Sequence, residues 1–96
     1  MDLDFLQKEV QERGKKMNIK PQTPVEVLVG ITEELGEVAK EVALFEKIGN
    51  KVNWKRNPDK ALLSEEISHL LVNVVSLASH YEIKISEIME ELFKKD

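Results

Sequence analysis

Hydrophobic residues recur three and four positions apart in four segments of the chain, with polar residues between them. This spacing places apolar side chains on one face of a helix, and no segment shows the alternation of period two that a half-buried strand needs. The pattern therefore predicts an all-α fold class, a four-helix bundle without a sheet. The predicted helices cover residues 3–17, 24–48, 59–80 and 85–94.

Cap residues mark the expected ends of these helices. Thr23 before Pro24 predicts an N-cap followed by proline at the first helical position of the second helix. The Gly49–Asn50 pair predicts the end of that helix. Asp59 and Ser86 predict the starts of the third and fourth helices.

The second predicted helix has an apolar face and an acidic arc. The acidic arc places four carboxylates within about two turns, where like charges repel, and lysines compensate them only in part. Taken alone, such an arc is also typical of a solvated helix face. The apolar face holds Val27, Leu28, Ile31, Leu35, Val38, Val42 and Phe45, and the acidic arc holds Glu33, Glu34, Glu37 and Glu41.

The third predicted helix is apolar over nearly its whole circumference, which predicts a buried helix. Its remaining narrow arc holds Glu66, His69, Asn73 and His80, with Ser76 nearby. Buried acids and imidazoles cost free energy unless they are paired, and a divalent cation shared with the acidic arc of the second helix would pair both sets. Each residue also has an interpretation without a metal. His69 is then a core histidine bonded to a neighbour, and Glu66 is an acid stabilised by the dipole of a nearby helix N-terminus.

Composition narrows the class of protein. Ninety-six residues predict a single domain over residues 1–96, small enough that pairing with a second copy is the expected way to complete its core. The net charge of −4 and the lack of a dense basic cluster argue against nucleic-acid binding. No signal-like N-terminus is present, and the apolar stretch 70–78 is too short to span a membrane. With no cysteine, a cytoplasmic location is expected.

Two short motifs on neighbouring helices resemble those of a known family. The segment from Glu34 to Glu37 reads Glu-x-x-Glu, and the segment from Glu66 to His69 follows after 28 intervening residues as Glu-x-x-His. The pair, in its helical frame, is similar to the MazG-like all-α nucleoside triphosphate pyrophosphohydrolases and their relatives, the dimeric dUTPases and phosphoribosyl-ATP pyrophosphohydrolases. The resemblance extends over roughly residues 3–93 and includes Gly36 inside the first motif.

The resemblance implies hydrolysis of a nucleoside triphosphate between its α and β phosphates, releasing a monophosphate and pyrophosphate in nucleotide-pool housecleaning. The family binds Mg²⁺ through four acids, which implies Glu34, Glu37 and Glu66 as metal ligands. It also implies Glu33 or Glu41 as the residue that orients the attacking water or supports the ligands. Asn73 lies where relatives place a polar residue that faces the nucleotide. A homodimer or homotetramer is the implied assembly.

The polar connection 49–60 offers candidate substrate contacts. Lys51, Lys55 and Arg56 are placed to meet phosphate oxygens, and Trp54, the sole tryptophan, to stack on a base. The alternative interpretation is a solvated connection in which Trp54 anchors the loop on the core.

His69 departs from the family pattern, which has aspartate at this position. The exchange removes a charge and a hard oxygen ligand, so Mg²⁺ affinity is expected to fall, while Mn²⁺ or a softer ion accepts the imidazole more readily. Two further interpretations stay open. In the first, the chain is a catalytically impaired protein that binds nucleotides or partners. In the second, it is a purely structural bundle used for assembly.

Overall fold

A computed structural model describes residues 1–17 and 20–94, and within these ranges the chain forms four α-helices and no strand. The all-α fold with four helices is therefore confirmed. A single turn of 3₁₀ helix with three residues, Gly49–Lys51, follows the second helix. The helices are α1 (Leu3–Lys16), α2 (Pro24–Glu46), α3 (Lys60–His80) and α4 (Ile85–Lys94).

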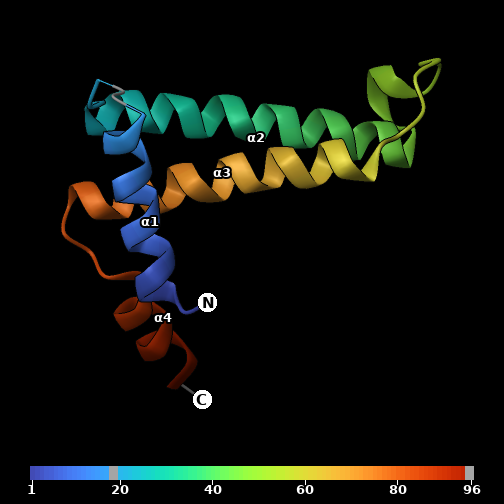
Figure 1. Cartoon of the computed structure of the whole chain (residues 1–96). Helices are drawn as coiled ribbons and strands as arrows, with labels where there is room; N and C mark the ends of the chain where they lie inside the picture. The colour runs from blue at the N-terminus through green and yellow to red at the C-terminus, as the bar shows by residue number, and fades with distance from the viewer. Residues whose placement is uncertain (18–19, 95–96) are drawn as a thin grey trace.

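The helices form two arms (Figure 1). Helices α2 and α3 lie side by side in opposite directions as one long hairpin, whose far end holds the 49–59 connection. Helix α1 crosses α3 near the other end of the hairpin, and α4 continues along α1 away from it. The molecule measures 44 × 42 × 25 Å along its principal axes. The long shared face of α2 and α3 is where residues from both helices meet.

Local capping explains where α2 and α3 begin. The Thr23 hydroxyl accepts from the backbone N–H of Glu26 at 3.2 Å, and the Glu26 carboxylate accepts from the N–H of Thr23 at 2.9 Å. This reciprocal capping box satisfies two N–H groups that a helix start leaves without partners. The same backbone hydrogen bond from Thr23 lowers the pKa of Glu26. Asp59 caps α3 by accepting from the N–H groups of Ala61 and Leu62, as predicted.

Two predicted caps are wrong, although α4 has the bounds that the sequence predicts. Helix α2 ends at Glu46 with the left-handed Lys47 (φ 52°) as its C-cap, two residues before Gly49, which is left-handed too (φ 58°). Ser86 lies inside α4, and its hydroxyl donates to the Asp4 carboxylate at 2.6 Å instead of capping its own helix. For Ser86, a contact with α1 takes the place of the local cap that the sequence predicts.

Gln7 of α1 joins three segments at the base of the second arm. Its amide nitrogen donates to the Ser79 hydroxyl at 3.0 Å and to the Ile83 carbonyl at 2.8 Å. Its amide oxygen accepts from the N–H of Ile85, the first residue of α4, at 3.0 Å. One side chain from α1 thus supplies the cap of α4 and fixes the turn between α3 and α4.

We expect Gln7→Leu to lower the free energy of unfolding by about 1–2 kcal/mol, because it leaves the partly buried N–H of Ile85 without a partner and removes the exposed bond to the Ile83 carbonyl. Hydrogen exchange should show lost protection in α4 while the hairpin keeps its protection. The neighbouring, exposed Lys8→Leu is the matched control. Equal protection of α4 in the two variants would refute the role of Gln7.

The described core of a single chain is small. Among the residues that the structure describes, three hydrophobic side chains are buried, namely Val27, Leu44 and Val75. The apolar face of α2 is divided, because Val27, Ile31 and Val38 are turned toward α3 while a second row is exposed. This exposed row is Leu28, Leu35 and Val42, each more than 40% exposed.

Helix α3 is not the buried helix that its sequence predicts. Ile67, Leu71 and Val74 are 47–52% exposed, and only Val75 is buried. The physical reason is geometric, since α2 and α1 cover two sides of α3 and leave a third side open. By length and composition α3 also meets the requirements of a membrane-spanning helix, which is weak evidence because the core helix of a soluble protein meets them as well.

The two open rows lie on the same side of the hairpin. On each helix, the exposed row follows by one residue the side chains that contact the other helix. One residue is a rotation of about 100° in an α-helix, and the rotation has the same sense on both helices. In an antiparallel pair this places them side by side. We call this surface the apolar face, and it consists of Leu28, Leu35, Val42, Ile67, Leu71 and Val74.

Candidate metal centre and adjoining pocket

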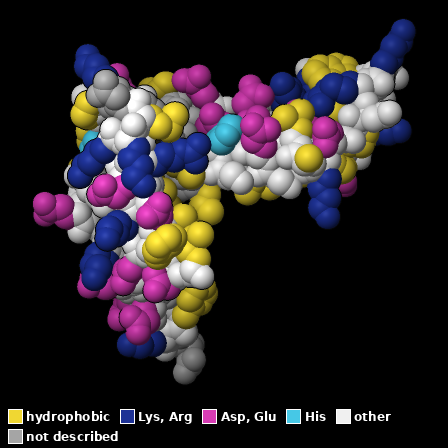
Figure 2. Space-filling view, viewed as in Figure 1, with side chains coloured by type: hydrophobic (Ala, Val, Ile, Leu, Met, Phe, Trp, Pro, Cys, Tyr) yellow, Lys and Arg dark blue, Asp and Glu magenta, His cyan; other side chains and the backbone are white. Residues whose placement is uncertain are grey.

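The opposite side of the hairpin is acidic. Glu33 and Glu37 of α2 and Glu65 and His69 of α3 are exposed on this side, with Glu34 and Glu66 half-buried where the helices meet. Figure 2 shows acidic side chains gathered around a histidine over this part of the hairpin. The spacing of three and four residues places these groups on one face of each helix. Antiparallel packing then brings the two faces together.

Three of these side chains converge. Ligand atoms of Glu34, Glu66 and His69 lie within 4.8 Å of one another. The His69 ring places Nδ1 3.8 Å from Glu34 Oε2 and Nε2 4.0 Å from Glu65 Oε1. Glu34 Oε2 is buried and has no hydrogen-bond partner among the described residues. A buried carboxylate oxygen without a partner is costly, so this atom is a candidate ligand rather than a structural contact.

The electrostatics of the cluster are those of crowded acids. Partial burial raises the pKa of Glu66, and the adjacent Glu34 carboxylate, to which Glu66 can donate only when protonated, raises it further. Repulsion from Glu34 and then Glu37 acts in the same direction, while His69 acts against it. Ionised Glu66 is therefore held at a free-energy cost in the folded protein. A cation at the cluster would remove that cost.

The other predicted acids of α2 lie outside this group of three converging side chains. Glu37 is half-exposed and forms an ion pair with Lys40 at 3.1 Å, although its charge still acts on Glu66. Glu33 is exposed on the acidic side. Thus Glu34 belongs to the cluster, Glu37 lies close enough to act on it by its charge, and Glu33 is exposed to solvent.

Glu41, the fourth acid, is bound to the loop. It is 1% exposed, and one guanidinium nitrogen of Arg56 donates to both of its oxygens at 3.0 and 2.8 Å. The Lys51 ammonium lies 3.4 Å above the Trp54 ring, and the Arg56 guanidinium carbon lies 5.9 Å from it. Of the predicted substrate contacts, the structure therefore gives Arg56 and Trp54 intramolecular partners.

Lys55 is exposed, as is 43% of Trp54. From the sequence, these loop residues were either phosphate and base contacts or a solvated connection with Trp54 as its anchor. The chain instead brings Arg56 back to α2, a pairing across 15 residues of sequence.

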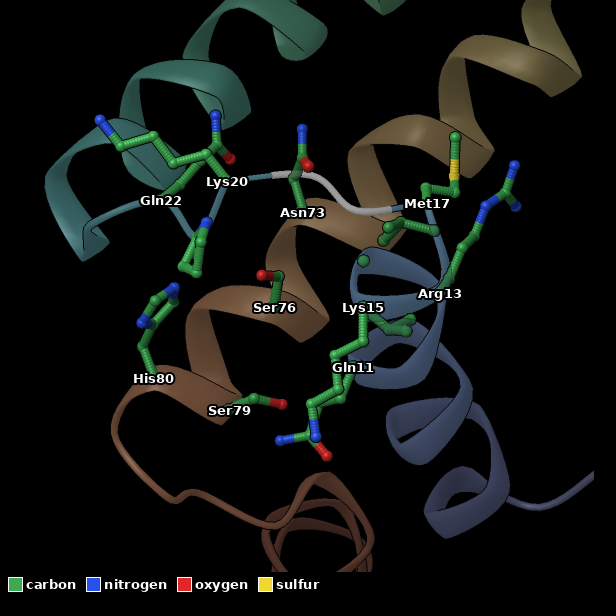
Figure 3. Close-up of a pocket in the computed structure, with 14 residues that line it drawn as sticks. Gln11, Arg13, Lys15, Met17, Lys20, Gln22, Asn73, Ser76, Ser79 and His80 are labelled. Atoms are coloured by element: carbon green, nitrogen blue, oxygen red, sulfur yellow. The ribbon is translucent and has the colours of Figure 1, made fainter.

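A pocket of about 660 Å³ adjoins the cluster along α3. Asn73 connects the two, because it lies one turn from His69 and also lines the pocket. A Cβ at Gly30 would lie 3.5 Å from the Asn73 amide nitrogen, so the small residue leaves room for this side chain beside α2. Ser76, Ser79 and His80 continue the α3 wall, which α1 and residues 20–22 face (Figure 3).

Sequence reasoning missed the contribution of α1 to this pocket. Gln11, Arg13 and Lys15 line it from α1, together with Lys20 and Gln22. The basic run near the end of α1 was a visible signal, but its neighbours in space depend on how α1 crosses α3.

The helical hairpin and its carboxylate–imidazole cluster define an all-α protein with a candidate centre for a divalent cation. The family model described as the MazG nucleotide pyrophosphohydrolase domain matches residues 22–96, and the chain belongs to this family. The match begins after α1, which nevertheless packs against α3 and α4. Comparisons with curated proteins and with solved structures gave no match.

Proposed function

We propose that the protein is a metal-dependent nucleoside triphosphate pyrophosphohydrolase that releases a nucleoside monophosphate and pyrophosphate. Family membership supports action on nucleoside triphosphates with a metal ion. The observation that carries the proposal for this chain is the convergence of Glu34, Glu66 and His69 around the buried Glu34 oxygen that has no partner. A housecleaning role in the cytoplasm stays a prediction.

The donor set fits a divalent cation. Ligand atoms at about 2 Å from an ion lie at most about 4 Å apart, so the three side chains need only a small inward movement from their present spacing. Glu37, next to the cluster, is the fourth proposed ligand, once it leaves Lys40. Two or three carboxylates with one imidazole suit Mn²⁺ better than Mg²⁺.

In this proposal the chain's own residues bind and orient the substrate. A bound cation would neutralise phosphate charge and polarise the phosphorus under attack. Glu33, exposed on the acidic side and adjacent to Glu34, is the proposed carboxylate that orients the attacking water. Asn73 is proposed to contact the nucleotide beyond the phosphates. The contact with Arg56 leaves Glu41 a supporting role at the far end of α2.

The experiment measures pyrophosphate release from a panel of nucleoside triphosphates with Mn²⁺, Mg²⁺ or a chelator. We expect turnover with Mn²⁺, less with Mg²⁺, and none with the chelator. Mn²⁺ alone should raise the melting temperature by binding only the folded chain. No turnover with any ion, despite a metal-dependent thermal shift, would favour the second candidate, a nucleotide-binding protein without hydrolysis. Half-exposed His69 in place of a carboxylate is the observation that favours it.

A second copy of the chain is the proposed occupant of the apolar face. Three buried hydrophobic residues are a small core for a stable domain, and six neighbouring apolar side chains are open on one side of the hairpin. The acidic face lies on the other side, so pairing through the apolar face leaves the cluster accessible. Light scattering should give at least twice the mass of one chain, and Leu35→Glu should reduce it. A wild-type mass of one chain would refute the assembly.

A further inference from the structure

The pocket beside the cluster differs in charge from the rest of the chain. The protein carries 18 acidic residues and a net charge of −4, yet no carboxylate lines the pocket among the described residues. Three cationic side chains do, those of Arg13, Lys15 and Lys20. Lys15 is 76% exposed, and its contact with Glu12 at 3.8 Å is a weak surface pair. The pocket is therefore a locally positive site next to a negative one.

One polar row of α3 joins the two sites. Glu66 and His69 belong to the cluster, and Asn73, Ser76 and His80 continue along the same side of the helix into the pocket. The intervals of three, four, three and four residues keep all five on one stripe. From His69 to Ser79, at the pocket's far part, the helix rises about 15 Å at about 1.5 Å per residue. A ligand extended along this row would touch both sites.

We propose that the pocket selects a nucleotide that carries a second anionic group, such as a phosphate, at its nucleoside end. This inference rests on the proposed pyrophosphohydrolase site. The triphosphate lies at the Glu34, Glu66 and His69 cluster, and the nucleoside extends past Asn73. The second anion then meets the cations of α1 and Lys20.

The walls fit such a ligand in chemistry as well as in charge. Figure 3 shows Ser76 and Ser79 of α3 on one wall and Gln11 and Lys15 of α1 on the other. Hydroxyls and amides bind sugar and base edges, and Val10, Met17 and Val72 add apolar surface. An uncharged nucleoside would use these groups but leave the positive charge uncompensated. Phosphate gives lysine and arginine charge-assisted hydrogen bonds.

The test compares pairs of substrates that differ only in the second anion. Nucleoside 5′-triphosphates of adenosine, guanosine, cytidine and uridine are each assayed with and without a 3′-phosphate, in Mn²⁺, by pyrophosphate release. We expect a KM about tenfold lower for the 3′-phosphorylated member of an accepted pair, as a charge-assisted contact would give. The advantage should shrink as salt is added, because exposed charges are screened.

Charge-neutral variants locate the contact. In Lys15→Gln and Lys20→Gln the advantage of the 3′-phosphate should fall, while the KM of the plain triphosphate stays nearly constant. Lys60→Gln removes an exposed lysine at the opposite end of α3 and should change neither KM. An equal rise in both KM values would overturn the proposal, because the cations would then serve the triphosphate common to both substrates. Equal KM values for the pair in the wild-type protein would overturn it too.

Failure of the two proposals is distinguishable. Turnover of plain triphosphates without any 3′-phosphate preference refutes the pocket assignment and leaves the proposed function intact. If no substrate is hydrolysed, the proposed function fails and calorimetric binding in Mn²⁺ decides the pocket. Tighter binding of the 3′-phosphorylated member, lost in Lys15→Gln, then supports it, and equal binding refutes it.

Discussion

Replacing His69 by aspartate is expected to increase Mg²⁺-dependent pyrophosphate release about tenfold or more, the range that a change at or around a metal ligand typically gives. The position lies within reach of Glu34 and Glu66, so the new carboxylate enters the cluster directly. It adds the hard oxygen and the negative charge that Mg²⁺ prefers. The advantage of Mn²⁺ over Mg²⁺ should decrease in the same variant, because the imidazole that favoured it is gone.

The same substitution has an opposite effect on the metal-free protein. A further carboxylate beside Glu34, Glu65 and Glu66 adds repulsion to a cluster in which the pKa of Glu66 is already raised. The variant should therefore melt at a lower temperature with a chelator and gain more stability from Mg²⁺ than the wild type does. The two measurements together distinguish a repaired metal centre from a general change in stability.

Ser68→Asp is the matched control for His69→Asp. It adds one carboxylate to the neighbouring position of α3, where the side chain is exposed and its hydroxyl bonds to the Ser64 carbonyl. This carboxylate lies outside the cluster and should leave metal preference unchanged. If both variants behave alike, charge alone and not ligand geometry explains the result. If His69→Asp gains no Mg²⁺ response, position 69 does not set the metal preference; if it also shows no turnover in Mn²⁺, the binding interpretation without hydrolysis replaces the enzymatic one.

Local patterns were sufficient to predict the helices and the convergence of part of the candidate site. Helical spacing located all four helices, and the caps at Thr23 and Asp59 depend only on residues three positions away or fewer. The convergence of Glu34, Glu66 and His69 was also predictable, because each motif lies on one face of its helix and the helices are neighbours. Once α2 and α3 pack antiparallel, little freedom remains in where these side chains meet.

Contacts between distant segments were not predictable in the same way. Gln7 bonds to residues more than 70 positions away, and no pattern around it signals a cap for α4. The division of the α2 apolar face into a covered and an open row depends on which side α3 occupies. The burial of Glu41 and its pairing with Arg56 depend on the path of the 49–59 connection. A helical wheel shows which residues share a face but does not show what covers that face.

Arg56→Ala is expected to lower the free energy of unfolding by about 2–3 kcal/mol, somewhat less than for a fully buried pair because the arginine is partly exposed. The buried Glu41 carboxylate would lose both of its hydrogen bonds, and an unpaired buried charge costs more than the pair contributes. Lys55→Ala, at an exposed neighbouring position, should change stability by less than about 0.5 kcal/mol. Chemical denaturation of the three proteins measures these differences.

The double variant Glu41→Gln with Arg56→Ala separates the two interpretations of Arg56. A neutral amide at position 41 tolerates burial better than a carboxylate, so most of the lost stability should return and the double-mutant cycle should show strong coupling. If the KM for triphosphate is then unchanged, Arg56 serves to fasten the loop to α2. A raised KM in this stable protein would instead restore the expectation from the sequence that Arg56 binds phosphate. In that case Arg56 would have to leave Glu41 when substrate binds, and substrate would increase the stability difference between Arg56→Ala and wild type, because it binds the wild type more tightly.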